Sequence, residues 1–391
     1  MRDNSVRTGG VIAVLMTGAL LAVAQMHLTV PLLGGVAARY GVSLSAAAWV
    51  GAGFGFAFAV GGLLFGPASD RYDRRQVMTF GLVASAVAAA VVGASPTFGA
   101  MLVSRVVQGF VAAAFPPVAL AYVGEVLPER RRAIGIASVS SSFLLAGIVG
   151  QSFAFGVDQL LGWRWAFWLL VPMLLACAAF VPRLPASSRT GAADLRATYA
   201  AFGDLLRRPA LLMGYVCAVT MLLTFIGMYT GLNGAVAERY GITGTGPLLA
   251  LRLAGLPGIA AGLAAGWLIG RIGLYRVAAL SFLTGAVGLL VEATAGPLWL
   301  LLAGSGLYVA GLSAAIPAVV AAVVRASGSA RGTGVAGYGF LVGLGGGIAP
   351  VLVTAVHGFG ALCLLLAAVL VVAAAAIGLG PRPRAMVTTS G

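Results

Sequence analysis

The sequence has little charge, few acidic residues and no lysine. Only 9% of its 391 residues are charged, ten are Asp or Glu, two are His, and all 24 basic side chains are arginines. A soluble domain carries about 25% charged residues, so this chain lacks the polar surface that a water-soluble protein of its length needs. Hydrophobic residues make up 60% of it, and the mean hydropathy is +1.03. We therefore predict that most of its surface faces lipid.

These absences exclude several classes of function. Without lysine the chain cannot contain the nucleotide-binding loop G-x-x-x-x-G-K-[ST], so we do not expect ATP-driven pumping by this chain alone. It has no H-E-x-x-H pattern and no paired aspartates, so nothing indicates a hydrolase or transferase site. The three cysteines lie within apolar runs, at spacings that suit neither a zinc site nor a disulfide framework. We expect no enzyme activity, no cofactor and no metal.

Long apolar runs are what the sequence offers instead. A helix needs about 20 apolar residues to cross a bilayer, and these continuous, non-alternating runs predict helices rather than strands. The first run follows Arg2 and Arg7 and exceeds the apolar region of a signal peptide, so we interpret it as a retained helix. Twelve runs are expected near 10–33, 45–66, 77–95, 98–123, 134–157, 164–182, 210–233, 248–269, 275–295, 298–324, 333–356 and 360–379.

The distribution of arginine predicts the orientation. With both termini in the cytoplasm, 19 of the 24 arginines fall in cytoplasmic segments. The five others, Arg39, Arg105, Arg164, Arg239 and Arg252, fall in outer loops or inside spans. Cytoplasmic loops of membrane proteins are enriched in Lys and Arg, so we expect a multi-pass protein of the inner (plasma) membrane with both ends in the cytoplasm. Clusters between apolar runs do not indicate nucleic-acid binding, despite the net charge of +14.

A polar connection divides the chain into two sets of six spans. It covers residues 184–209 and contains a possible short amphipathic helix from Asp194 to Leu206. We expect an N-terminal six-helix bundle at 1–183, a cytoplasmic linker at 184–209, a C-terminal six-helix bundle at 210–380 and a cytoplasmic tail at 381–391.

The two halves repeat each other at an offset of 200 residues. The phrase VAARYGVS ends at Ser43 and VAERYGIT ends at Thr243. At the same offset Gly66 aligns with Gly266, Arg71 with Arg271, and Pro117 with Pro317. Six spans is an even number, so both copies enter the membrane from the same side. This predicts two repeats related by an axis along the membrane normal, with a substrate site between them at the midplane.

One loop motif resembles a known family. The segment GPASDRYDRR after the second span is similar to the signature G-x-x-x-D-R-x-G-R-[RK] of the major facilitator superfamily, with Asp73 where the family usually has glycine. The resemblance implies an all-α membrane fold of twelve transmembrane helices in two pseudo-symmetric six-helix bundles. It also implies a conformational latch at Gly66, Asp70, Arg71, Arg74 and Arg75; the alternative is an ordinary arginine-rich cytoplasmic loop.

Three further motifs resemble the drug:proton antiporter branch of that family. RVVQGFVAAAFPP (105–117) matches a fourth-helix motif that is linked to proton transfer, through Arg105, Gln108 and Gly109. An arginine inside a span indicates function, although Arg105 is close enough to the outer boundary to reach water by snorkelling. AGIVGQSFAF (146–155) matches the fifth-span motif only in part, and GWRWAF (162–167) also suits an interfacial aromatic belt.

Few residues in the spans can bind a proton or a polar group. His27 is the only histidine deep in a span, and an unperturbed histidine titrates near neutral pH, so we assign proton coupling to His27 and Arg105. A hydrogen-bonded packing role is the alternative for His27. The acidic residues Asp158, Glu238 and Glu292 lie close to outer span ends. Candidate substrate contacts are Gln25, Met26, Gln108, Phe115, Tyr229, Asn233 and Tyr338.

Together these features predict a secondary active transporter that works by alternating access. A cavity lined mainly by apolar and aromatic side chains favours proton-coupled efflux of hydrophobic or amphipathic small molecules. The alternative is an exporter or importer of a small polar metabolite such as a sugar or amino acid. The expected partners are a small-molecule substrate, protons and the lipid bilayer, with no nucleic acid, and we expect a monomer.

Overall fold

The computed structural model describes residues 2–186, 203, 207–242, 251, 255–328 and 331–380. Every regular element within these ranges is a helix. In the first half these are α1 (Arg2–His27), α2 (Thr29–Tyr40), α3 (Leu44–Arg71), α4 (Arg74–Ala94), α5 (Phe98–Ala112), α6 (Pro116–Val126), α7 (Glu129–Leu161), α8 (Trp163–Trp168), α9 (Leu170–Phe180) and the 3₁₀ turn η1 (Val181–Arg183). In the second half they are α11 (Pro209–Tyr240), α13 (Leu256–Ile272), α14 (Leu274–Thr294), α15 (Leu298–Ser327), α16 (Arg331–Ala355) and α17 (Phe359–Leu379).

Proline explains why three of the expected spans are interrupted. The first, fourth and sixth spans are each divided into two helices, α1 and α2, α5 and α6, and α8 and α9. The fourth span breaks at Ala113, four residues before Pro117. The first and sixth spans break at Leu28 and Leu169, three residues before Pro31 and Pro172. Proline has no N–H, and its ring clashes with the carbonyl four residues earlier, so the helical hydrogen bond is lost there. The first of these breaks places His27 at the end of α1.

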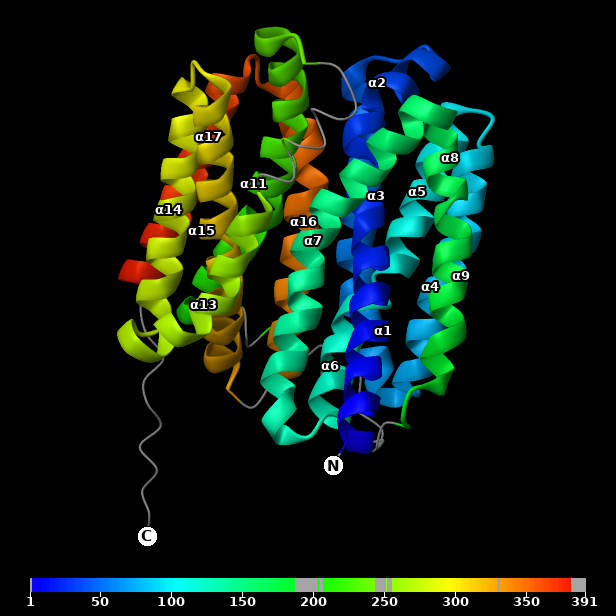
Figure 1. Ribbon diagram of the computed structural model, residues 1–391, viewed down its shortest axis with the longest axis vertical. Helices are drawn as coiled ribbons and strands as arrows, with labels where there is room; N and C mark the ends of the chain where they lie inside the picture. The colour runs from blue at the N-terminus through cyan, green and yellow to red at the C-terminus, as the bar shows by residue number, and fades with distance from the viewer. Residues whose placement is uncertain are drawn as a thin grey trace.

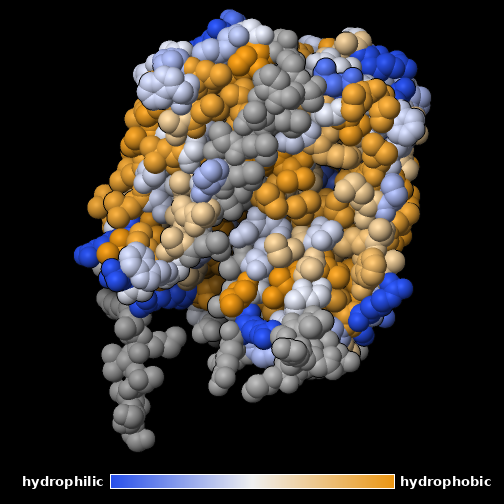
Figure 2. Space-filling model, in the orientation of Figure 1, coloured by the Kyte–Doolittle hydropathy of each residue, from blue (hydrophilic) through white to orange (hydrophobic). Residues whose placement is uncertain are grey.

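Among the described residues, eleven helical segments are long and apolar enough to cross a membrane. The eighth expected span, near 248–269, lies partly outside the described residues, and the apolar part of α13 that is described, Ala260–Ile272, is shorter than a span. The all-helical membrane fold is thus confirmed, whereas the count of twelve, the two six-helix bundles and the domain boundaries remain predictions. In Figure 2 hydrophobic residues cover the middle of the molecule, and hydrophilic residues gather toward its upper and lower edges.

The described residues of each half pack around a core of their own. One core collects side chains between Val11 and Leu184, and the other collects side chains between Leu211 and Ile377. A smaller cluster contains Met26 and Phe54 of the first half together with Ile226 of the second. Figure 1 shows α1 to α9 on the right and α11 to α17 on the left, with α3, α7 and α16 near the middle.

Close packing of α3 against α16 joins the two halves. A Cβ atom built on Gly55 would lie 2.5 Å from the backbone N of Gly347, and one built on Gly343 would lie 2.9 Å from Cα of Ala59. Real side chains do not fit at such distances, so glycine is required where the two backbones approach. Gly55 of α3 and Gly343 of α16 therefore lie at the contact between the halves.

The repeated phrase has the same local structure in both copies. The Tyr40 hydroxyl donates a hydrogen bond to the Ser95 carbonyl at 2.9 Å, and the Tyr240 hydroxyl donates one to the Gly296 carbonyl at 3.0 Å. The glycine after each tyrosine ends its helix with φ of 63°, a left-handed conformation that favours glycine. The motif thus ties the end of one helix to the loop between α4 and α5 in the first half and to the loop between α14 and α15 in the second.

Candidate functional site

Arg105 is at the centre of a buried hydrogen-bond network in the first half. Its guanidinium donates to the Gln108 side-chain oxygen at 2.7 Å, to the Gln25 carbonyl at 3.2 Å and to the Val50 carbonyl at 3.3 Å. The Gln108 amide in turn donates to the Gln25 side-chain oxygen at 2.9 Å. Arg105, Gln108 and Gln25 have no solvent exposure. The network connects α1, α3 and α5, and it brings together three of the residues predicted from the sequence.

Two aromatic rings complete the surroundings of the guanidinium. Its central carbon lies 4.3 Å from the ring centre of Phe54 and 5.6 Å from that of Phe167. Cation–π contacts of this kind contribute up to about 2 kcal/mol when desolvated. Arg105 therefore does not snorkel to water. None of the ion pairs found among the described residues includes Arg105, so neutral acceptors and aromatic rings hold its charge.

His27 lies two residues from Gln25, where the two halves meet. Its side chain is fully buried, and neither ring nitrogen has a hydrogen-bond partner among the described residues. The imidazole contacts the ring of Phe225 from α11 edge-on, at 5.7 Å between centroids. A Cβ built on Gly147 of α7 would lie 2.2 Å from the same phenyl ring. Phe225 thus inserts between α1 and α7 of the opposite half, and the described residues give His27 ring contacts but no hydrogen bond.

The other predicted substrate contacts fall into three groups. Met26 lies at the junction of the halves, with its sulfur 3.0 Å from the Cβ position of Gly346, and the Tyr229 ring packs on Phe225 at 5.0 Å. Phe115 instead packs against Gly18 in the core of the first half. The two remaining candidates belong to the second half, where Asn233 is half-buried on α11 and the Tyr338 hydroxyl contacts the Met221 sulfur at 3.5 Å.

The predicted latch residues make their described contacts mainly within the first half. Arg74 forms a two-point ion pair with Glu125 of α6, at 2.7 and 3.1 Å, and Arg75 pairs with Asp73 at 2.8 Å. Arg75 also donates to the Leu184 carbonyl. Toward the second half, the Cβ position of Gly66 lies 3.9 Å from Cβ of Ala336. The side chain of Asp70 lies outside the described residues, Arg71 has a polar or electrostatic contact, and the latch role remains a prediction.

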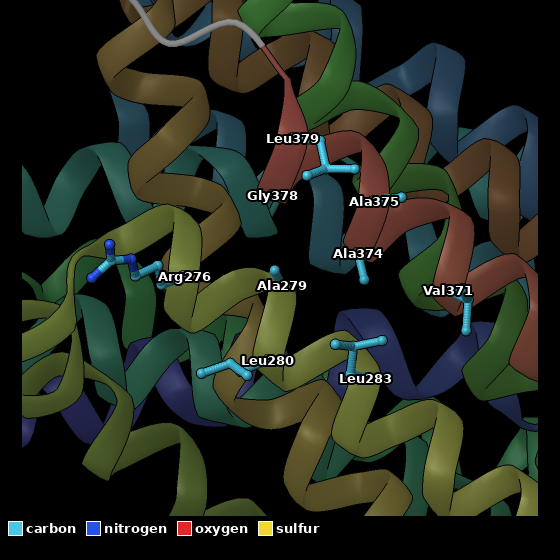
Figure 3. Close-up of a pocket in the computed structure, with 9 residues that line it drawn as sticks. All are labelled: Arg276, Ala279, Leu280, Leu283, Val371, Ala374, Ala375, Gly378 and Leu379. Atoms are coloured by element: carbon cyan, nitrogen blue, oxygen red, sulfur yellow. The ribbon is translucent and has the colours of Figure 1, made fainter.

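Two of the surface hollows that the described residues form have a volume of about 500 Å³ each. One lies between α14 and α17, where Leu280, Leu283 and Val371 line it and Arg276 lies at its edge (Figure 3). The other is formed by residues near Gly10 and Arg183. Neither lies between the two halves, where the side chains of Met26 and Phe225 pack in this conformation.

Sequence reasoning did not assign a role to four residues that the structure singles out. Phe225 and Glu125 are described above, and the side-chain amide of Gln151 is fully buried without a hydrogen-bond partner among the described residues. Glu292 is fully buried as well. Gln151 and Glu292 were visible in the sequence as polar residues within or beside spans, but their burial depends on which face of the helix is turned inward.

Comparison with known proteins agrees with this architecture. The model of the Major Facilitator Superfamily matches residues 15–273. Multidrug resistance protein 3 of Bacillus subtilis is 25% identical over a region that covers 43% of this chain and 33% of its own length. Puromycin resistance protein pur8 of Streptomyces alboniger is 30% identical over a region that covers 50% of this chain and 39% of its own length. The matched region thus spans between a third and two fifths of these relatives.

A solved structure shows the same fold over almost the whole chain. The human organic anion transporter MFSD10 superposes with a TM-score of 0.70 over 94% of this chain and 99% of its own, at 18% identity. The family model covers well over half of the sequence, and the buried arginine network and the GPASDRYDRR loop lie within the matched range. The chain belongs to the Major Facilitator Superfamily.

Proposed function

We propose that this protein is a secondary transporter that exports hydrophobic or amphipathic small molecules in exchange for protons, by alternating access. The carrying observation is the position of His27. It is a titratable side chain, fully buried, without a hydrogen-bond partner among the described residues, in contact with Phe225 of the opposite half. A change in its charge acts directly on the contact that must open and close during transport.

The sign of this effect follows from the surroundings of His27. Protonation makes both ring nitrogens donors, and the described residues supply no acceptor for either. It also adds a cation within one helical turn of Gln25, whose carbonyl binds Arg105. A buried charge without partners is costly, so protonation favours a conformation in which the halves separate and water reaches the imidazole. Loss of the proton favours the closed contact with Phe225.

The chemistry of the junction supports an apolar or amphipathic substrate. Met26, Phe225, Tyr229 and the cluster around Phe54 supply aliphatic, sulfur and aromatic surface, and sites of this kind bind apolar ligands with few polar contacts. Gln151 adds an unpaired amide that can bind one polar group of a substrate. Two relatives are named for multidrug resistance and puromycin resistance, which supports the same class of substrate.

A transport assay with the two histidines tests the proposal. The purified protein is reconstituted in proteoliposomes, and an imposed pH gradient drives uptake of a cationic dye, puromycin or a sugar. We expect the gradient to accelerate dye and puromycin uptake at least several-fold, and we expect no effect on sugar. His27→Ala should remove this acceleration while substrate exchange without a gradient continues. His357→Ala is the matched control, because His357 is exposed in an outer loop, and it should behave like the unmodified protein.

Three results would each contradict a part of the proposal. Transport at a rate that does not depend on the pH gradient would contradict proton coupling. Transport of the sugar but of neither the dye nor puromycin would favour a polar metabolite as the substrate. A His27→Ala variant with unchanged pH dependence removes His27 from the coupling role.

A further inference from the structure

A buried cluster of an acid, a thiol and a hydroxyl group lies inside the second half, away from His27. Its central group is Glu292 on α14, whose side chain is fully buried within the core of that half. One carboxyl oxygen is 3.9 Å from the Cys363 sulfur of α17, and the other has no hydrogen-bond partner among the described residues. Ionisable residues within membrane spans mark functional sites by default. Packing alone does not explain a carboxyl group here, since a leucine would fill the same space.

Glycine makes room for this carboxyl group. A Cβ built on Gly304 of α15 would lie 3.0 Å from Cγ of Glu292 and 3.1 Å from its backbone N. The Glu292 side chain therefore passes over a bare stretch of α15 into the bundle. Gly288, one turn earlier on α14, approaches the backbone of Tyr308 in the same way. The local sequence thus favours entry of the glutamate between α14, α15 and α17.

Titratable groups from the neighbouring helices surround Glu292. From α17, Cys363 is in contact with Glu292, and from α15 Tyr308 lies one helical turn after Gly304, the glycine that the Glu292 side chain passes. From α11, Arg239 lies near the end of α14 that carries Glu292. A Cβ atom built on Gly360 of α17 would lie 3.9 Å from the Nη2 atom of Arg239 and 3.3 Å from the carbonyl oxygen of Ala293, the residue after Glu292. The remaining neighbour, α13, carries Arg271 at the opposite end of α14.

A hydrogen bond connects this cluster to the junction of the halves. The Tyr308 hydroxyl donates to the Thr224 hydroxyl of α11 at 3.0 Å, and both residues are buried. Thr224 immediately precedes Phe225, the residue that inserts against His27 and Gly147. A change in charge at Glu292 therefore acts on a hydrogen-bonded pair that adjoins the closing contact.

We propose that Glu292 is a second proton-binding group of the transport cycle, which takes up a proton from the outer side and is held neutral in the conformation described here. When the outer end of the bundle opens, the exposed Arg239 stabilises the ionised carboxylate until one proton from that side adds to it and forms the neutral acid. The same proton leaves toward the opposite side later in the cycle. This inference rests on the proposed proton coupling, and it assigns to the second half a group that acts together with His27 in the first.

Infrared spectroscopy tests the proton on Glu292 without a transport measurement. Exposed carboxylates are ionised at pH 7, so a C=O band of a protonated carboxyl at that pH reports a buried acid. We expect this band in the reconstituted protein and expect its loss in Glu292→Gln. Glu238→Gln, which changes an exposed glutamate on α11, should leave the band unchanged. Absence of the band in the unmodified protein, or its persistence in Glu292→Gln, would overturn the proposal.

Transport separates a proton carrier from a permanently neutral side chain. In proteoliposomes without a pH gradient, the Glu292→Gln variant should exchange dye at a rate within about twofold of that of the unmodified protein. A pH gradient should stimulate its transport at least tenfold less than it stimulates transport by the unmodified protein. Unchanged stimulation in Glu292→Gln, with stimulation intact in the unmodified protein, overturns the role of Glu292 alone. Lack of stimulation in the unmodified protein overturns the proposed function itself.

Discussion

A single methyl group on Gly55 should hinder the contact between the two halves. In Gly55→Ala the new Cβ would lie 2.5 Å from the backbone N of Gly347 and 2.6 Å from its Cα. Carbon atoms in contact are normally 3.5–4.0 Å apart, so α3 and α16 must separate by roughly 1 Å to accept the methyl group. Overpacking of this kind costs about 1–3 kcal/mol, and neither backbone has a flexible side chain that could move aside.

That cost acts on the conformational equilibrium of the transporter. A change of about 1–3 kcal/mol shifts an equilibrium between two states by roughly 5- to 150-fold. We expect Gly55→Ala to reduce the transport rate by a factor in that range and to lower the unfolding temperature. Gly62→Ala is the matched control on the same helix, because no atom lies within 4 Å of its Cβ position.

Both quantities can be measured on the same preparation. Transport is followed by dye exchange in proteoliposomes, and unfolding is followed with a thiol-reactive fluorophore, because Cys177, Cys217 and Cys363 are free and buried. The Gly62→Ala variant should transport at the normal rate and unfold at the same or a slightly higher temperature, since alanine favours helix by up to about 1 kcal/mol. Equal behaviour of the two variants would refute the close approach of α3 and α16.

Three further predictions concern polar contacts. Arg105→Lys should slow transport at least tenfold with normal expression, because lysine cannot reproduce the three guanidinium hydrogen bonds to Gln25, Val50 and Gln108; normal transport would remove the network from the mechanism. Glu125→Gln should destabilise the protein by about 1–3 kcal/mol, because the largely buried Arg74 loses the negative charge that Glu125 places beside it, and an unchanged unfolding temperature would contradict this. Tyr40→Phe and Tyr240→Phe should each lower the free energy of unfolding by about 0.5–1.5 kcal/mol, because each substitution removes one hydrogen bond to a loop carbonyl. A loss of stability in only one of the two variants would contradict the equivalence of the two copies.

The sequence predicted the position of features along the chain better than the partners of those features. Continuous apolar runs placed most helices within a few residues, although α2 and α11 run on to Tyr40 and Tyr240, beyond the expected ends near 33 and 233. The RYG phrase predicted the repeat whose two copies share one local structure. Arg105, Gln108 and Gln25 were recognised as candidates and lie together. Each of these depends on the local pattern of residues, which a single sequence contains.

The inward face of each helix was harder to predict. In a soluble protein the polar face of a helix marks the solvent side, but lipid and protein interior are both apolar, so that signal is absent within the membrane. Glu292 was therefore placed at an outer span end without its burial being evident, Phe225 was indistinguishable from other phenylalanines, and Phe115 was proposed as a substrate contact although it packs on Gly18. The breaks before Pro31 and Pro172 also divide spans that were expected to be continuous.

The central claim is that the two halves move against each other in response to protons and substrate. The direct measurement is the distance between spin labels across each face: Arg132 with Arg271 near the loops that follow α6 and α13, and Leu161 with Glu238 near the loops that follow α7 and α11, all four at helix ends. We predict that lowering the pH or adding substrate shortens one of these distances and lengthens the other. Two distances that keep the same distribution under every condition would contradict alternating access in this protein.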